Sequence, residues 1–147
     1  MKTKIIIGTI LLILLIGSVT AFEIKDLKPI NGYDEFDVNG QSNYTTNNHR
    51  YIYVEKIATI DDEFINEWFT NHTEHNFTTS PVGDNIFYFE DQNFNFYGYQ
   101  EVVNIDGTNY MVSINQESKL SPSEKTEFLN DLKEFNKQNN IKTISVT

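Results

Sequence analysis

The sequence predicts an α+β fold in which a mostly antiparallel sheet carries two helices on one face, in the element order ββ-β-α-ββ-ββ-α-β. Two kinds of local signal support this prediction. Asn39-Gly40 and Asp106-Gly107 are dipeptides typical of two-residue hairpin turns, and each separates two segments that contain strand-forming residues. Asp61 and Ser121 are good helix N-cap residues, and each precedes apolar side chains at helical spacing.

An N-terminal apolar segment precedes the folded part and has the pattern of a secretory signal. Two lysines precede an uncharged apolar run from residue 5 to residue 17, and small side chains follow up to Ala21. We therefore expect a signal peptide at 1–21, cleavage after Ala21, and a protein that is extracellular or associated with the cell envelope. The alternative is an uncleaved N-terminal anchor, which would contact the membrane only through residues 1–22.

The rest of the chain is predicted to be a linker followed by one domain. Pro29 and Asn31-Gly32 indicate a linker at 22–31, and residues 32–147 are enough for a single α+β domain. The chain contains no cysteine, which excludes disulfides, thiolate chemistry and a lipoprotein-type lipid anchor.

The first half of the domain is predicted to contain three strands and a short helix. The strands are 33–38 and 41–46, joined through the Asn39-Gly40 turn, and 50–59. The helix should begin after Asp61, with acidic residues in its first turn and Ile60 and Ile65 in the positions of a hydrophobic staple, and should end near residue 71.

The second half is predicted to contain two hairpins, a long helix and a final strand. The hairpins are 85–90 with 94–99, and 102–105 with 108–114, the latter with Val103 opposite Tyr110 and Ile105 opposite Thr108. Ser121-Pro122-Ser123-Glu124 combines an N-cap, a proline at the first helical position and a capping-box glutamate. The helix should stop at Asn139-Asn140, and 141–146 should form the last strand.

The buried positions follow from the same periodicities. We expect one core that contains Phe64, Trp68, Phe87, Phe89, Val103, Ile105, Val112, Phe128, Leu132 and Phe135.

The net charge restricts the possible partners. The whole chain carries a formal charge of −10, and loss of Lys2 and Lys4 with the leader would make it −12. Phosphate backbones and anionic lipid head groups would be repelled by such a domain, which excludes nucleic acid as a partner. A basic or neutral protein, or a cell-surface polymer, fits the charge.

The segment most similar to a metal site is Asn71–Asn76, where His72, Glu74 and His75 are permissible zinc ligands. The third histidine, His49, is distant in sequence, and the motif HExxH is absent. We interpret these side chains as solvated residues of a polar loop at 71–84, and we assign no metal, cofactor-binding or catalytic residue.

Other motifs also have simpler structural explanations. Residues 35–40 have a partial calcium-loop pattern, but no helices flank them and a hairpin turn explains the same residues. The acid pairs Asp34-Glu35, Asp61-Asp62 and Glu90-Asp91 could in principle act as general acid and base, but each lies at a helix start or beside a turn. Potential N-glycosylation sites occur at Asn43, Asn71 and Asn76, as many as composition alone would produce.

The chain is rich in residue types that bind sugars in other proteins. It contains 18 asparagines, 8 tyrosines and 11 phenylalanines, and aromatic rings interleaved with amides suggest a carbohydrate-binding face. An AT-rich genome would enrich the same residues without selection for a ligand, and we take this as the simpler explanation.

Three segments resemble parts of small exported proteins of unknown function from methanogenic archaea: the lysine-led apolar start, the hairpin IDGTNYMVSI and the tail LNDLKEFNKQNNIKTISV. The resemblance covers the leader and about the last 45 residues. It implies export and fold, and it carries no activity, cofactor or site residue.

We therefore expect an exported, non-enzymatic binding module of the extracellular space or cell envelope. Its exposed aromatic residues and the 71–84 segment are the expected contact surfaces. The alternative is a small two-carboxylate hydrolase that acts on a cell-envelope polymer.

Overall fold

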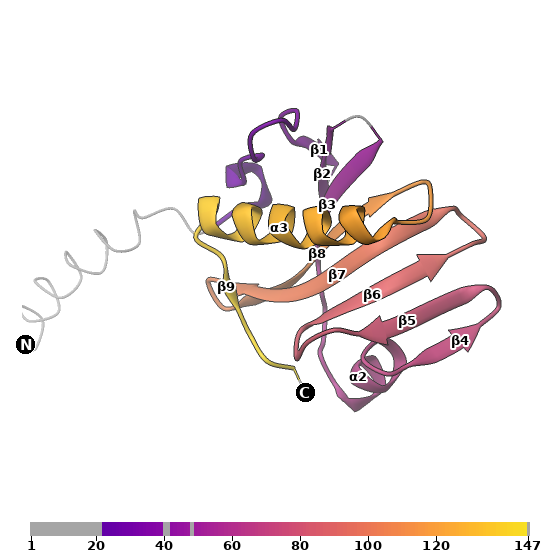
Figure 1. Cartoon of the computed structure of the whole chain (residues 1–147). Helices are drawn as coiled ribbons and strands as arrows, with labels where there is room; N and C mark the ends of the chain where they lie inside the picture. Colours follow the sequence, from indigo (N-terminus) through magenta and orange to yellow (C-terminus); the bar gives the residue numbers. More distant parts are fainter. Residues whose placement is uncertain (1–21, 40–41, 48, 147) are drawn as a thin grey trace, which may run out of the picture.

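The computed structural model describes residues 22–39, 42–47 and 49–146, and within them the fold is α+β with one antiparallel sheet. The strand order is β1-β2-β3-β8-β7-β6-β5-β4, and β9 pairs with the end of β7 (Figure 1). The strands are β1 (Asp37–Asn39), β2 (Ser42–Asn47), β3 (Arg50–Lys56), β4 (His72–Glu74), β5 (Phe77–Pro81), β6 (Ile86–Asp91), β7 (Phe96–Ile105), β8 (Thr108–Gln116) and β9 (Lys142–Thr143). The predicted signal segment 1–21 lies outside the described residues.

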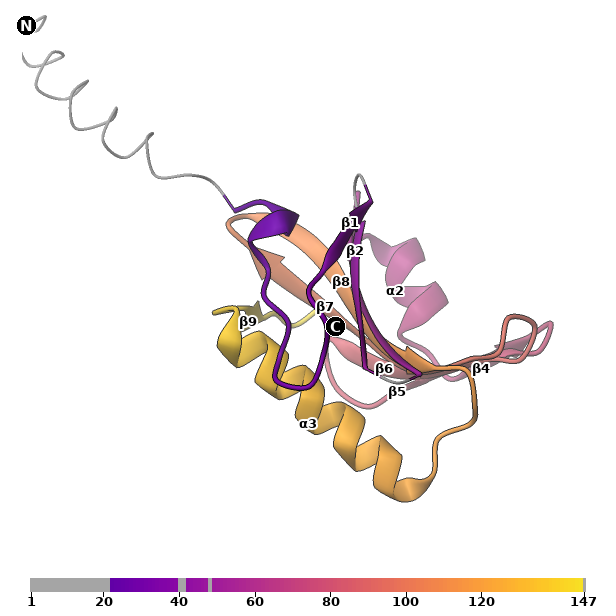
Figure 2. The same ribbon diagram turned by 90° about the horizontal axis from the view of Figure 1, so that it is seen from above.

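The two α-helices pack on opposite faces of the sheet, so the prediction that both lie on one face is wrong. Helix α3 (Pro122–Gln138) covers one face, and the short helix α2 (Asp62–Trp68) lies against the other (Figure 2). The reason lies in strand β6, because Phe87 and Phe89 point to the α2 face while Ile86 and Tyr88 point to the α3 face. Both faces of β6 are apolar, so a packed element must shield each face from water.

The predicted core is therefore divided into two clusters. Phe128, Leu132 and Phe135 of α3 are buried on Val103 and Val112, together with further apolar residues of β3, β7 and β8. On the other face Phe87 and Phe89 are buried beside α2, whose Phe64 and Trp68 are only partly buried. Ile105 is also partly buried, at the margin of the α3 cluster.

The Asp106-Gly107 turn and the N-cap of α2 are confirmed, whereas α2 ends at Trp68 instead of near residue 71. Asp106 and Gly107 both have positive φ (52° and 86°), and the hairpin that they close pairs Val103 with Tyr110 and Ile105 with Thr108. The Asp61 side chain accepts a hydrogen bond from the Phe64 backbone N–H, as expected for an N-cap.

Helix α3 begins and ends where the sequence predicts. Ser121 and Glu124 form a reciprocal capping box, with Pro122 at the start of the helix. Asn140 adopts the left-handed conformation just beyond the helix, with φ of 53°.

Three predicted elements differ from the structure. The polar loop at 71–84 is wrong, because most of this segment forms the β4–β5 hairpin, turning at His75 and Asn76 with positive φ (48° and 66°). Residues 94–99 and 102–105 are not separate strands, since Phe96–Ile105 is continuous and Phe94 is exposed in the preceding turn. The last strand is reduced to Lys142–Thr143.

The segment 22–31 packs on the domain instead of forming the free linker that the sequence predicts. It contains a short 3-10 helix, η1 (Ile24–Asp26), and Leu27 and Ile30 are buried in the α3-face core. The Phe22 ring meets Tyr110 edge to face, with centroids 5.6 Å apart. The two-residue turn predicted at Asn39-Gly40 is wrong, because Asn39 belongs to β1 and pairs with Ser42, and Val38 pairs with Asn43 instead of Gln41. Gly40 and Gln41 lie outside the described residues.

Candidate functional site

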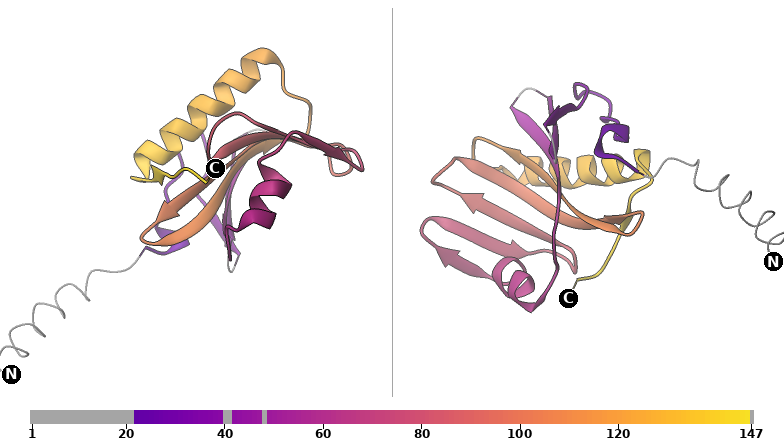
Figure 3. Two further views of the ribbon diagram at one scale, coloured as in Figure 1. Left: turned by 90° about the horizontal axis from the view of Figure 1, so that it is seen from below. Right: turned by 180° about the vertical axis from the view of Figure 1, so that it is seen from behind.

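An open pocket lies on the α2 face of the sheet. Helix α2 is short and lies over only part of this face (Figure 3). Its rings contact β5 and β6: Trp68 meets Phe77 and Phe87, and Phe69 meets Phe87. Beside the helix a cavity of about 400 Å³ remains, in the range of small-molecule sites. We call it the aromatic–amide pocket, defined by Tyr53, Trp68, Phe77, Phe89 and Phe96 together with Gln100, Ser113 and Asn115.

The floor of the pocket results from the alternation of strand β8. Val112 and Ile114 point to the α3 face and are fully buried there. Ser113 and Asn115 alternate with them along the strand, so both point to the α2 face. Ser113 is 6% exposed and Asn115 is 4% exposed. Gln100 of β7 is the cross-strand partner of Ser113, and its side chain makes no hydrogen bond to another described residue.

Asn115 carries a buried polar atom that has no hydrogen-bond partner in the described structure. Its Nδ2 donates a hydrogen bond to Ser113 Oγ at 3.1 Å, but its buried Oδ1 has no donor among the described residues. An unpaired buried acceptor destabilises a protein by about 1–3 kcal/mol. Such a group is retained at a cost to stability, and Asn115 is one of the residues that line the cavity.

Aromatic rings form the walls and hold one another in place. The Trp68 ring stacks on Phe87, with centroids 5.9 Å apart and planes at 21°, and meets the Phe77 ring edge-on at 5.6 Å. Tyr53 stacks on Tyr51, with centroids 6.1 Å apart. The indole N–H of Trp68 has no acceptor within the described part of the chain.

The rim of the pocket is acidic. Glu55 and Asp91 lie at its edge, and no lysine or arginine lines it. An adjoining cavity of about 540 Å³ shares Glu55, Trp68 and Gln100 with the pocket and extends along α2 past Glu67. Lys56 also lines this adjoining cavity, and carboxylates outnumber cationic side chains in the lining of the two cavities together.

The histidines of the β4–β5 hairpin do not form a metal centre with a third ligand. His75 Nδ1 lies 3.4 Å from Glu74 Oε1, and His72 Nε2 lies 4.0 Å from Glu74 Oε2. His49 lies between β2 and β3, toward the opposite edge of the sheet. Within the described ranges, no three His, Asp or Glu side chains gather closely enough to hold a metal ion.

Each predicted acid pair has at least one carboxylate with a structural partner. Asp61 is the α2 N-cap, and Asp91 Oδ1 accepts the backbone N–H groups of Asn93 and Phe94 in the β6–β7 turn. Glu90 accepts the Tyr88 hydroxyl at 2.7 Å, and Thr46 Oγ1 lies 3.2 Å from Asp34 Oδ2. These contacts give the carboxylates structural roles. Of the partial calcium-loop pattern, Asp37–Asn39 form strand β1 and the two residues before it lead into this strand, whereas Gly40 lies outside the described residues.

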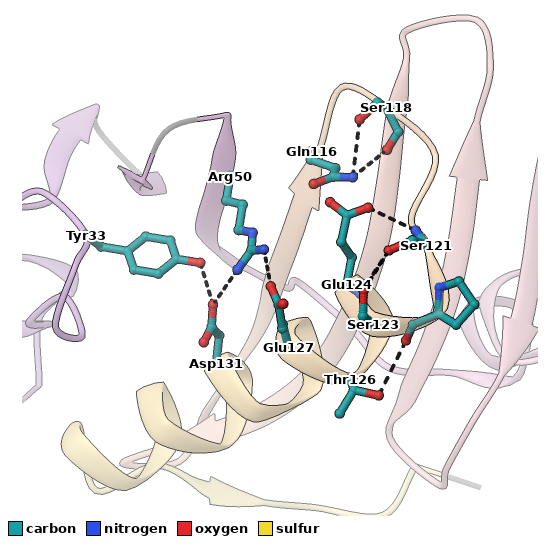
Figure 4. Close-up of polar contacts among 11 residues, drawn as sticks. Tyr33, Arg50, Gln116, Ser118, Ser121, Ser123, Glu124, Thr126, Glu127 and Asp131 are labelled. Carbon is teal, nitrogen blue, oxygen red and sulfur yellow. Dashed lines mark hydrogen bonds and ion pairs between the residues drawn. The ribbon is translucent and has the colours of Figure 1, made fainter.

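A second polar cluster, on the α3 face, is satisfied internally (Figure 4). Arg50 of β3 pairs with Glu127 and lies 3.5 Å from Asp131 of α3, and the Tyr33 hydroxyl donates to Asp131 at 2.8 Å. The Arg50 guanidinium also lies over the Phe128 ring, at 4.9 Å. Burial, and then the Asp131 hydrogen bond, raises the Tyr33 pKa. This cluster binds the N-terminal segment and β3 to α3, and its groups are already paired with one another.

The pocket residues were not identified from the sequence, although a signal for them was present. The predicted face of Val103, Tyr110, Val112 and Ile114 implies that Ser113 and Asn115 share the opposite face. What the sequence did not indicate is that Trp68, Phe77 and Phe96, from three other elements, surround these amides.

No helix in the described part of the chain combines the length and the apolar character that a membrane span requires. The chain matches no protein-family model, no curated protein and no solved structure.

Proposed function

We propose that this protein is an exported, non-enzymatic module that binds a component of the cell envelope or extracellular space in the aromatic–amide pocket. One observation carries the proposal: the buried Asn115 carbonyl has no donor in the described structure, and Asn115 is one of the residues that line a cavity of about 400 Å³. A ligand donor would satisfy this carbonyl, and the destabilisation of about 1–3 kcal/mol would be relieved on binding.

Export rests on the sequence. The lysine-led apolar leader and the resemblance to small exported proteins of methanogenic archaea support a secreted or envelope-associated protein. N-terminal sequencing of the native protein tests it: a first residue at Phe22 supports cleavage after Ala21, whereas retention of Met1 means an anchor through residues 1–22.

Binding is favoured over hydrolysis because of the roles of the carboxylates. At least one acid of each pair that could serve a hydrolase has a structural partner: Asp61 caps α2, Asp34 contacts Thr46, and Glu90 and Asp91 accept hydrogen bonds in and beside the β6–β7 turn. The floor of the pocket is instead made of amides and a hydroxyl, groups that recognise a ligand without reacting with it. The overall acidity agrees with a neutral or basic partner.

Co-sedimentation with insoluble envelope material of the native host tests the proposal, with the protein purified from that host. We expect the protein to sediment with the material and to release no reducing ends from it. The Asn115→Leu variant should lose at least tenfold in binding, which corresponds to about 1.4 kcal/mol. Asn130→Leu, the same change at an exposed position of α3 on the opposite face, should bind normally.

Two results would overturn the proposal. Equal binding by the Asn115 and Asn130 variants would show that the pocket is not the site. Release of reducing ends that one acidic substitution abolishes would identify the hydrolase instead. Thermal unfolding followed by circular dichroism shows that each variant is folded before it is compared.

A further inference from the structure

We infer that the ligand of the aromatic–amide pocket is an uncharged saccharide chain. This inference rests on the proposed function and names the chemical class that the pocket recognises. Four properties of the described residues carry it: the position of the pocket on the sheet, its mixture of donors and acceptors, its aromatic walls and its charge.

The position of the pocket excludes recognition of a peptide by strand addition. Its floor is made by β3, β8, β7 and β6, and each of these strands has a neighbouring strand on both sides. Their backbone N–H and C=O groups are therefore used within the sheet, and strand addition needs a free edge. A ligand on this face is recognised through side chains alone.

The pocket offers both kinds of hydrogen-bonding group. Asn115 Oδ1 is an acceptor without a donor, and the Trp68 indole N–H is a donor without an acceptor in the described structure. The Gln100 side-chain amide, which has no hydrogen bond to another described residue, can donate and accept hydrogen bonds. A sugar hydroxyl also donates and accepts, so a hydroxyl-rich ligand can satisfy all three side chains. A lipid chain would cover the amides without pairing them, which is unfavourable.

The aromatic walls complement the other surface of a sugar. A pyranose ring has a face of C–H groups with its hydroxyls around the edge, and this face packs on the flat side of an aromatic ring. Tyr53, Trp68 and Phe96 line the cavity around the polar floor and are only partly buried, so their rings remain available to a ligand. Rings as walls and amides as floor match the two surfaces of one sugar unit.

Charge and size complete the argument. Glu55 and Asp91 at the rim, and the net charge of −10, disfavour phosphorylated, sulfated or uronic-acid sugars. The adjoining cavity shares Trp68 and Gln100 with the pocket, so consecutive units of one chain can occupy the two depressions of about 400 and 540 Å³.

The test compares three preparations of the same envelope material in the co-sedimentation assay: untreated, oxidised with periodate, and digested with proteinase K. Periodate cleaves vicinal diols, so we expect at least a tenfold loss of binding after oxidation and no change after proteolysis. The opposite pattern would identify a protein partner: the saccharide inference would then be wrong, while dependence on Asn115 would still support the proposed function.

A direct titration provides the second measurement. Trp68 is the only tryptophan of the chain and lines the pocket, so its fluorescence reports on occupancy. Neutral hexasaccharides with vicinal diols (cellohexaose, xylohexaose and mannohexaose) should include one that shifts the Trp68 emission saturably and releases the protein from envelope material.

The Gln100→Ala variant should weaken this binding at least fivefold, and Gln92→Ala, the same change in the exposed β6–β7 turn, should not. If none of the three sugars competes and periodate-treated material binds normally, the saccharide inference is refuted.

Discussion

Replacement of Glu101 by glutamine should stabilise the protein at neutral pH. Glu101 of β7 is 7% exposed, lies under α3, and accepts a hydrogen bond from Asn136 Nδ2. Asn136 Oδ1 is buried without a donor in the described structure. An ionised Glu101 has no proton to donate to Asn136 Oδ1. A glutamine at the same position would keep an acceptor for Asn136 Nδ2 and add an N–H donor for Asn136 Oδ1.

The magnitude follows from the two buried groups. A donor for Asn136 Oδ1 removes an unsatisfied acceptor, so we expect Glu101→Gln to raise the free energy of unfolding by about 1–3 kcal/mol at pH 7. Burial raises the pKa of Glu101, and the hydrogen bond from Asn136 lowers it by a smaller amount. The folded state therefore holds this proton more tightly than the unfolded state does.

The sign of the pH dependence follows from this raised pKa. The stabilising contribution of protonated Glu101 is complete below the pKa of the unfolded chain, and it is lost as the pH rises through the higher pKa of the folded protein. The advantage of the glutamine variant should consequently be largest at pH 7–8 and should shrink as the pH falls toward the ordinary glutamate range.

Urea unfolding at a series of pH values, followed by Trp68 fluorescence, measures this difference. Glu134→Gln provides the control, because Glu134 is exposed on α3, the helix that carries Asn136. Its effect on the free energy of unfolding should stay within about 0.5 kcal/mol. The reasoning would be refuted if the Glu101→Gln variant were less stable than the native protein at pH 7. It would also be refuted if the gain in the free energy of unfolding were the same at all pH values.

Two further predictions concern packing. Leu132→Ala should lower the free energy of unfolding by about 2–5 kcal/mol in urea titrations, because this side chain is 1% exposed. Leu129→Ala, at a partly buried position, should lower it by less. Equal losses for the two variants would contradict the assigned helix face. Gly98→Ala should be more destabilising than Gly107→Ala by the same measurement, since a Cβ at Gly98 would lie 1.9 Å from the Ile114 carbonyl oxygen, whereas Gly107 is open and has only its φ of 86° against substitution. Equal losses at the two glycines would refute the close approach of β7 to β8.

Local chemistry allowed a large part of the fold to be predicted. The Asp106-Gly107 turn, the Ser121–Glu124 capping box and the Asp61 N-cap act within a few residues of themselves, so their sequence context is sufficient. The β4–β5 hairpin was missed because its polar threonines and histidines resemble a loop, although threonine favours strands and a His75-Asn76 turn can adopt positive φ.

The positions of the two helices and of the candidate site depend on tertiary structure. Strand periodicity determines which residues share a face, but it does not determine which face a short helix will cover when both are apolar, as at Ile86–Phe89. Gln100 and Glu101 look like a polar break between two strands, yet they are neighbours in one strand that point to opposite sides.

The sequence by itself thus determined the α+β class, the Asp106-Gly107 turn, the helix N-caps and the α3 stripe, because each local signal depends on interactions within a few residues. Only the tertiary structure placed Asn115 and Gln100 beneath Trp68 and left the Asn115 carbonyl without a donor. That arrangement depends on pairings between strands far apart in the chain, such as β3 with β8, and local periodicity contains no information about them.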